Sequence, residues 1–137
     1  MALERFSTDL LTVSVNGRLI NDWGTADPPW SDSSLDDPSV LMRGLGGGAI
    51  RFDRTNPGRA VTLSLMPGSP DSAYMQGLFN SKANVTITFT QIGTLEEAVG
   101  TEGLIVNDGP RNRGGPNISD DVYNLQFNGW TAFKGGN

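Results

Sequence analysis

The feature that most limits how this chain can fold is a strict alternation of apolar and polar side chains in short runs. In residues 84–92, Val85, Ile87 and Phe89 alternate with threonines. A two-residue period places the apolar side chains on one face of a strand, and β-branched residues favour an extended backbone. Three further runs alternate in the same way: 10–15, 49–54 and 60–66. The chain is therefore expected to form a sheet that buries one of its faces.

A turn motif indicates how the first of these strands connects. Asn16-Gly17 directly follows the run 10–15. Both residue types accept the positive φ values of a type I′ turn, which joins two antiparallel strands. Residues 18–21 should therefore return as the hairpin partner of the first strand.

A second hairpin is expected in the middle of the chain. Asn56-Pro57-Gly58 lies between the runs 49–54 and 60–66, and these residue types favour a turn. The alternation in the first of these runs places Ile50 and Phe52 on one face, which we expect to point inward.

Helical periodicity occurs in one stretch, residues 70–80. The apolar side chains there form a single stripe: Tyr74, Met75, Leu78 and Phe79. Ser69 stands where a helix N-cap belongs, and Pro70 suits the first helical position. The spacing predicts a short helix that packs across the sheet.

The last third of the chain predicts two more strands and a loop. Leu104-Ile105-Val106 is typical of one strand, and residues 122–133 predict the last, with a bulge at Gly129. Residues 107–119 hold two prolines and three glycines and predict a loop. With about six to eight strands, the expected fold is mainly β, an antiparallel β-sandwich or partly closed β-barrel with one short flanking α-helix. We expect a single domain over residues 1–137.

Residues 21–39 break the strand pattern. They hold five aspartates, three prolines and two tryptophans, but no lysine or arginine. Long loops without regular structure usually serve a function or are disordered, and large apolar side chains favour a function. We expect no regular structure in this segment. An interaction loop at about residues 21–48 should become ordered against a neighbouring molecule.

Charge is divided between this segment and the next. Residues 21–39 have a net charge of −5, whereas residues 41–66 carry four arginines and one aspartate, a net charge of +3. Complementary blocks guide subunit association, so the acidic segment of one subunit should meet the basic region of another, although the arginines could instead form an anion site. The expected interface residues are Trp23, Trp30, Leu35, Leu41, Met42, Leu45, Arg51 and Arg54.

Two absences limit the chemistry that is available. The 137 residues include no cysteine and no histidine, which excludes disulfides, thiolate metal sites and Ser-His-Asp or Cys-His catalysis. The remaining reactive groups do not cluster, so we expect no enzyme activity, no catalytic residues and no cofactor. A net charge of −5 disfavours a simple nucleic-acid-binding module. The first residues lack an export pattern, so we expect synthesis in the cytoplasm and no membrane anchoring.

Two weaker patterns favour structural roles over chemistry. Residues 44–49, Gly-Leu-Gly-Gly-Gly-Ala, match the spacing of a dinucleotide-binding loop, but a strand rather than a helix should follow. A glycine hinge is the better interpretation. Asp32, Asp36 and Asp37 lack the spacing and the glycine of a calcium loop, and no pocket is predicted around them. We therefore expect no metal site.

Several segments resemble the tail tube proteins of contractile-tailed bacteriophages, which are related in fold to type VI secretion tube proteins. Gly58-Arg59-Ala60-Val61-Thr62-Leu63-Ser64-Leu65 followed by Ser69-Pro70-Asp71 is similar to the place where a strand of that family ends and a helix begins with Ser-Pro and Asn or Asp. Gly103-Leu104-Ile105-Val106 and Asp120-Asp121-Val122-Tyr123-Asn124 are similar as well. The order of elements agrees over residues 10–133, although the acidic segment is longer than the family pattern.

This resemblance implies a structural subunit of a virion tail. Six copies would close into a ring in which neighbours continue one another's sheets, and the rings would stack into a hollow tube. Sheath, baseplate or initiator, and terminator proteins would be partners. DNA would pass through an acidic lumen without specific binding.

Two alternatives remain open at the level of the sequence. One is a tail terminator or connector protein of the same class. The other is a carbohydrate-binding β-sandwich module that uses Trp23 and Trp30 as stacking faces, with Trp130 in the core.

Overall fold

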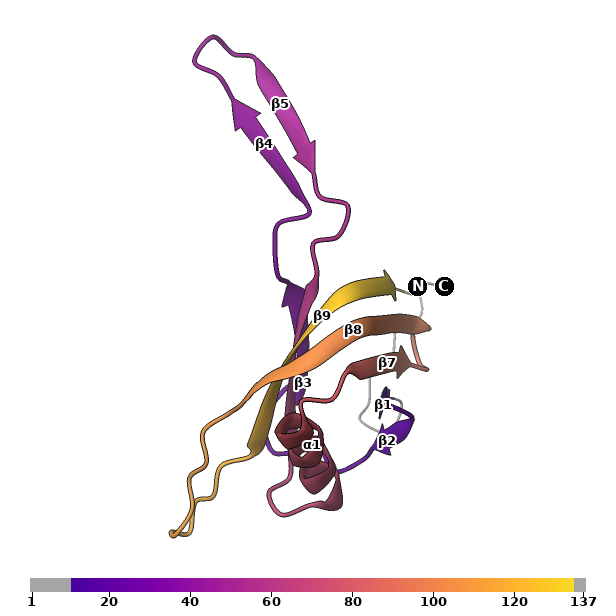
Figure 1. The fold of residues 1–137 in the computed structure, drawn as a ribbon, viewed down its shortest axis with the longest axis vertical. Helices are drawn as coiled ribbons and strands as arrows, with labels where there is room; N and C mark the ends of the chain where they lie inside the picture. The colour runs from indigo at the N-terminus through magenta and orange to yellow at the C-terminus, as the bar shows by residue number, and fades with distance from the viewer. Residues whose placement is uncertain (1–10, 135–137) are drawn as a thin grey trace.

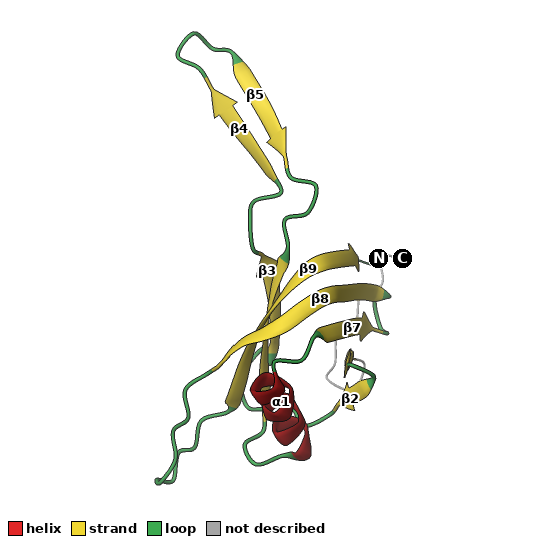
Figure 2. Cartoon of the chain, in the orientation of Figure 1, coloured by secondary structure: helices red, strands yellow, loops and turns green. Residues whose placement is uncertain are grey.

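The computed structural model describes residues 11–134, and strands dominate it (Figure 1 and Figure 2). The strands are β1 (Leu11–Val15), β2 (Arg18–Ile20), β3 (Trp30–Ser34), β4 (Ser39–Arg43), β5 (Ala49–Asp53), β6 (Arg59–Leu65), β7 (Val85–Gln91), β8 (Glu96–Asp108) and β9 (Asp121–Phe133). Helix α1 (Pro70–Ser81) lies between β6 and β7. The predicted class, mainly β and antiparallel with one helix, is confirmed. The expectation about the first residues of the chain lies outside the described part.

Seven of these strands form one antiparallel sheet in the order β2-β1-β7-β8-β9-β6-β3, and the other two, β4 and β5, pair with each other. The large sheet curls strongly. Trp30 of β3 stacks on Phe89 of β7 with ring centroids 4.8 Å apart, although three strands separate them in the sheet order. The edge strands β2 and β3 do not pair with each other, so the sheet is curled but is not closed into a barrel.

The hydrophobic core lies inside the curl of the sheet. Its nearly inaccessible side chains are Val13, Val15, Ile20, Val61, Leu63, Leu65, Met75, Val85, Ile87, Ile105, Tyr123, Leu125 and Phe127. Helix α1 packs against this core through the predicted stripe: Met75 is buried, and Tyr74, Leu78 and Phe79 are partly buried. Figure 2 shows the helix beside the curled sheet. No helix within residues 11–134 is long and apolar enough to cross a membrane.

Local sequence explains the first hairpin and the start of the helix. Asn16 and Gly17 have φ values of 49° and 86°, as the type I′ turn between β1 and β2 requires. The Oγ of Ser69 accepts a hydrogen bond from the Ser72 N–H at 3.2 Å, and Pro70 begins the helix. The predictions of this hairpin and this helix are confirmed.

The prediction that residues 21–39 lack regular structure is wrong. Strand β3 lies within this segment and pairs along its length with β6, with Trp30 opposite Leu63. The sequence gives little sign of this strand, because β3 is an edge strand and three of the four residues after Trp30 are serines. An edge strand with a single large apolar side chain leaves little alternation in the sequence.

The predicted second hairpin is also wrong. Strand β5 pairs with β4, whereas β6 pairs with β3 and β9. Ile50 and Phe52 consequently do not point inward, because 66% and 50% of their surfaces are exposed. The turn residues around Asn56 lead from β5 back to the large sheet instead of joining two neighbouring strands.

The last two strands are longer than predicted, and the bulge between them lies at a different position. Strand β8 already begins at Glu96. The sequence does not indicate this early start, because the buried residues there, Ala98 and Gly100, are small and give a weak hydrophobic pattern. The pairing of β8 with β9 continues without a shift past Gly129, and the bulge lies between Ile105 and Asn107.

Candidate assembly surface

Strands β4 and β5 project from the body as an isolated hairpin (Figure 1). We call residues 39–54 the arm. Its base stays connected to the large sheet by backbone hydrogen bonds. The Arg54 N–H donates to the Pro38 carbonyl at 2.8 Å, and the Asp36 N–H donates to the Pro57 carbonyl at 3.2 Å. The arm is therefore an extension of the β3–β6 pair and not a loose loop.

One face of the arm is wholly apolar. The register places Val40 opposite Phe52 and Met42 opposite Ile50. Because directly opposed side chains lie on the same face and successive ones alternate, these four residues share one side, which we call the apolar face. The Arg54 guanidinium lies 5.5 Å from the centre of the Phe52 ring, but Met42 is 59% exposed, so most of this face lacks a covering layer in the described part of the chain. An isolated two-stranded hairpin is only marginally stable in water when no other layer covers its apolar face.

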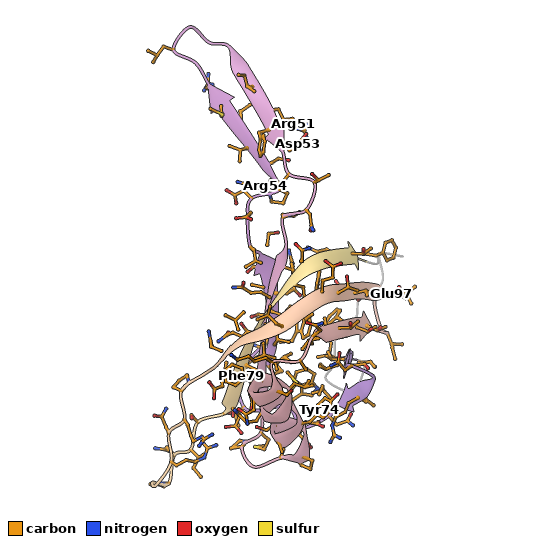
Figure 3. The ribbon with its side chains drawn as sticks, in the orientation of Figure 1. Arg51, Asp53, Arg54, Tyr74, Phe79 and Glu97 are labelled. Atoms are coloured by element: carbon orange, nitrogen blue, oxygen red, sulfur yellow. The ribbon has the colours of Figure 1, made fainter. Side chains whose placement is uncertain are left out.

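The other face of the arm is more polar: it holds Leu41 and Ala49, but its remaining side chains are polar or charged, and three of them bind one another. Arg51 forms an ion pair with Asp53 at 2.8 Å, and the Ser39 hydroxyl donates to the same carboxylate at 2.8 Å. The hydrogen bonds from Arg51 and then Ser39 hold the pKa of Asp53 below its usual value. Arg54 lies at the base of the arm, where its Nε donates to the Asp37 carbonyl at 3.0 Å (Figure 3).

The tip of the arm is a glycine turn. The Gly44 N–H donates to the Gly48 carbonyl at 2.7 Å, and Gly47 adopts a φ of 90°, which favours glycine. Leu45 is fully exposed at the end of this turn. Strands lie on both sides of the turn, so it lacks the strand-to-helix setting of a dinucleotide-binding loop.

The eight predicted interface residues do not lie together. Six of them are exposed on the arm or beside it: Leu35, Leu41, Met42, Leu45, Arg51 and Arg54. The two tryptophans belong to the body and have partners in their own chain. Trp30 stacks on Phe89 and its Nε1–H donates to Asp32 at 2.8 Å, while Trp23 packs against the core. The interface role of all eight residues stays a prediction.

Of the four residues of the apolar face, the sequence analysis named only Met42 as an interface residue. Ile50 and Phe52 had been placed inward because an alternating pattern shows which side chains share a face but not what covers that face. The signal that could have found the arm is the short alternation at Val40 and Met42, which mirrors that of β5 across the glycine turn. Trp130 lies partly buried against the core, with its ring centroid 5.9 Å from that of Phe127.

The outward face of the sheet is almost free of positive charge. Strands β1, β7, β8 and β9, which are neighbours in the sheet, contain no lysine or arginine. Hydroxyl and amide side chains alternate with the buried ones: Thr12, Ser14, Thr86, Thr88, Thr90, Thr101, Gln126, Asn128 and Thr131. Exposed Glu97 and Glu102 add negative charge. Such a face would not retain a polyanion.

A cleft of about 730 Å³ lies between the start of α1 and the loop that joins β8 to β9. The Ser72 hydroxyl donates to Asp121 at 2.5 Å, and the Tyr123 hydroxyl donates to the Ser72 carbonyl at 3.0 Å. Burial raises the pKa of Tyr123. Burial would also raise the pKa of Asp121, but the hydrogen bonds from Ser72 and Arg113 lower it overall. Across residues 11–134, no three acidic side chains gather as metal ligands would.

Comparison with known proteins gives no family model and no curated protein that matches the chain. Solved structures do share its fold. The tube-terminating cap of the anti-feeding prophage aligns with a TM-score of 0.58 and 16% identity, over 98% of this chain and 94% of that chain. The sheath/tube terminator of an extracellular contractile injection system, in its extended state, aligns with a TM-score of 0.59 and 15% identity, over 97% and 99%.

A component of a sheath–tube complex is also similar. A chain of the sheath–tube complex of an extracellular contractile injection system aligns with a TM-score of 0.53 and 16% identity, over 95% of this chain and 92% of that chain. These structures are parts of tubes and terminators rather than enzymes. At such identities the likeness establishes the fold, which is the tail-tube fold that the sequence resemblance predicted.

Proposed function

We propose that the chain is a structural subunit of the inner tube of a contractile injection apparatus, and that six copies close into rings that stack coaxially. The observation that carries this proposal is the arm. Its apolar face is largely exposed within the described residues, and the arm extends from a body whose fold is shared with components of such tubes and terminators. A second copy of the chain would supply the missing layer.

The open edges of the sheet support ring closure. Among the strands of residues 11–134, β2 and β3 each pair on one side only, so this part of the chain leaves a row of backbone groups free on the other side of each. Exposed edges favour pairing with another chain, and a closed ring of identical subunits leaves no edge unpaired. Sheath, baseplate and terminator proteins are the partners that we expect, in an assembled tail particle of a phage or a phage-like machine that is made in the cytoplasm.

The outward face of the central strands supports a role as a conduit. We assign this face, which has Glu97 and Glu102 but no lysine or arginine in its strands, to the wall of the lumen. A neutral to acidic wall lets DNA pass because it makes no ion pairs with phosphates. Passage of DNA without specific binding is therefore part of the proposal.

A tube terminator is the second candidate function. The two terminator structures align with TM-scores of 0.58 and 0.59, against 0.53 for the chain of the sheath–tube complex. A terminator forms one ring that caps the tube, whereas a tube subunit stacks without limit. The difference between the two roles is therefore whether rings continue to stack.

Electron microscopy of the purified full-length chain at increasing concentration tests the proposal. We expect end-on views with six-fold symmetry and an open centre. Extended tubes support the tube role, and single rings that do not grow support the terminator role. Particles that keep the size of one chain at every concentration would refute both.

A further inference from the structure

Strand β8 continues past the start of its neighbour β7 (Figure 1). The pairing of β7 with β8 stops at Val85 opposite Gly103, whereas β8 extends to Asp108. Residues 104–108 pair with β9 on one side, and within residues 11–134 no strand pairs with their other side. Alternate residues of an antiparallel strand direct their backbone groups to opposite sides. This stretch, which we call the β8 edge, therefore offers N–H and C=O groups to a further strand.

An apolar groove of about 540 Å³ lies beside the β8 edge, between this strand and the end of α1. Phe79 lies at the end of α1 beside β8 (Figure 3). Leu104 and Val106 on the strand wall are 52% and 40% exposed. When a peptide adds a strand to a sheet edge, its alternate side chains occupy pockets beside that edge. The apolar residues that line the groove are Leu78, Phe79, Ala83, Leu104, Ile105 and Val106.

Hydrogen bonds at the end of α1 fix the helix wall of the groove. The Ala83 N–H donates to the Leu78 carbonyl at 3.1 Å, and the Lys82 N–H donates to the Phe79 carbonyl at 3.2 Å. The Ser81 hydroxyl donates to the Leu78 carbonyl at 3.2 Å. A groove that exists before binding loses little conformational entropy when it is filled.

Lys82 is the one charged residue that lines this groove. The lining includes no aspartate or glutamate, and none of the ion pairs within residues 11–134 involves the Lys82 ammonium group. Lys82 also has a φ of 54°, a left-handed conformation that glycine or asparagine adopts more easily at the end of a helix. The helix end itself therefore does not favour a lysine, and its charge is available to a partner.

We infer that the β8 edge and this groove bind an extended segment of another protein, which adds a strand beside residues 104–108. The segment places apolar side chains at alternate positions in the groove, and it carries an aspartate or glutamate that pairs with Lys82. The arm of a second copy does not fit this description, because it has three arginines and one aspartate. The site lies within one chain, so it does not depend on the proposed ring formation.

Peptide selection tests the site, with the full-length chain as the immobilised target. The library consists of seven-residue peptides with apolar residues at alternate positions and Ser, Thr, Asp, Glu or Lys between them. We expect the enriched peptides to contain Asp or Glu and to lack Lys. Enrichment of lysine-containing peptides, or no enrichment above an empty support, would overturn the inference.

Two valines of the same strand provide a matched pair of variants. Val106 lines the groove, Val99 lies elsewhere on β8, and both are 40% exposed. Val106→Asp should weaken the binding of an enriched peptide by about ten-fold or more, because it places a carboxylate in the apolar groove. Val99→Asp should leave binding unchanged. Fluorescence anisotropy titrations compare the two, and equal effects would show that the peptide binds elsewhere.

Lys82 allows a test of charge that does not disturb the fold. Glycine suits the positive φ at this position, so Lys82→Gly should unfold at the wild-type temperature or higher, yet bind the acidic peptide about ten-fold more weakly. Lys82→Glu should reverse the preference, so that the same peptide with Lys in place of its acid binds this variant more tightly than the wild type. Lack of that reversal would contradict the ion pair.

Hydrogen exchange locates the added strand. Peptide binding should slow the exchange of backbone amides in residues 104–108 and not in the edge strands β2 and β3. Protection of β2 or β3 instead would overturn the inference, as would protection of residues 104–108 by a second copy that the peptide does not displace. Failure to form rings would refute the proposed function but would leave peptide binding unaffected.

Discussion

The carboxylate of Asp71 at the start of α1 accepts a hydrogen bond from the backbone N–H of Asn21 at 2.7 Å, which ties the helix to the end of the first hairpin. The same carboxylate accepts from the Asp22 N–H and from the Nε of Arg18, both at 3.0 Å. Its residue is only 3% exposed. One side chain thus fixes the place where the chain leaves β2, before the segment that contains β3 and leads to the arm.

Acid should weaken the protein through this carboxylate. Burial raises the pKa of Asp71, but the hydrogen bonds from Asn21, Asp22 and Arg18 lower it overall. A pKa that is lower in the folded than in the unfolded chain stabilises the fold above the ordinary aspartate pKa of about 3.9, and this stabilisation disappears as the pH falls through the folded value. Urea unfolding across pH should show a free energy of unfolding that is flat near neutrality and falls below about pH 4.

The variant Asp71→Asn isolates this contribution. It should lower the free energy of unfolding at pH 7 by about 1–3 kcal/mol, because buried N–H donors lose a charged acceptor. It should also make the acid limb shallower than in the wild type. The limb should not vanish, since the pKa of Asp120 and the pKa of Asp121 are also lowered. Equal acid limbs in both proteins would show that Asp71 does not contribute.

Gly103 is required by the aromatic ring opposite it. Gly103 of β8 pairs with Phe127 of β9, and a Cβ at this position would overlap the Phe127 ring. We expect Gly103→Ala to lower the free energy of unfolding by about 1–3 kcal/mol, because the buried ring must move. Gly46→Ala at the tip of the arm is the control, since nothing lies within 4 Å of the added methyl. Thermal unfolding of both variants measures the difference, and equal values would contradict the account.

Trp30 should matter for the stability of the subunit itself. The sequence analysis predicts an interface position for it, but its ring also stacks on Phe89 of its own chain across the curl of the sheet. Trp30→Ala is expected to cost about 2–4 kcal/mol of unfolding free energy, and Leu63→Ala in the core about 2–5 kcal/mol. Leu45→Ala should change it by less than about 0.5 kcal/mol. Denaturant titrations would contradict this assignment if Trp30→Ala unfolded like the wild type.

Assembly should depend on one face of the arm more than on the other. The double variant Met42→Ser, Ile50→Ser removes apolar surface from a face that the body does not cover. The free energy of unfolding of the subunit should therefore stay close to that of the wild type, whereas ring formation should be lost. Leu41→Ser, on the opposite face, is the matched control and should assemble better than that pair. Sedimentation velocity at fixed concentration compares them. A stronger defect in Leu41→Ser would show that the polar face makes the contact.

The parts of the fold that were predictable are those with local causes. The turn at Asn16-Gly17 and the capped helix after Ser69 depend on residues that are close together in sequence. Strand β7 was predictable because its apolar side chains alternate regularly with threonines. The pairing of β5 with β4 instead of β6 is a non-local choice, and the turn residues on both sides of β5 do not distinguish the two outcomes.

The candidate site was predictable only in part, for a different physical reason. The apolar alternation at Ile50 and Phe52 was read as core, because in a subunit that folds alone such a face is normally buried. Its cover is expected from another molecule, and one chain's sequence cannot indicate where that molecule lies. The packing of Trp30 within its own chain could not be predicted either, because its partner Phe89 is distant in sequence.

Native mass spectrometry of the purified full-length chain tests the central claim most directly. As the concentration rises, the account predicts a discrete species of six times the 14.6 kDa chain mass, followed by multiples of that ring if the chain is a tube subunit. A spectrum that contains only the 14.6 kDa monomer at every concentration would contradict it.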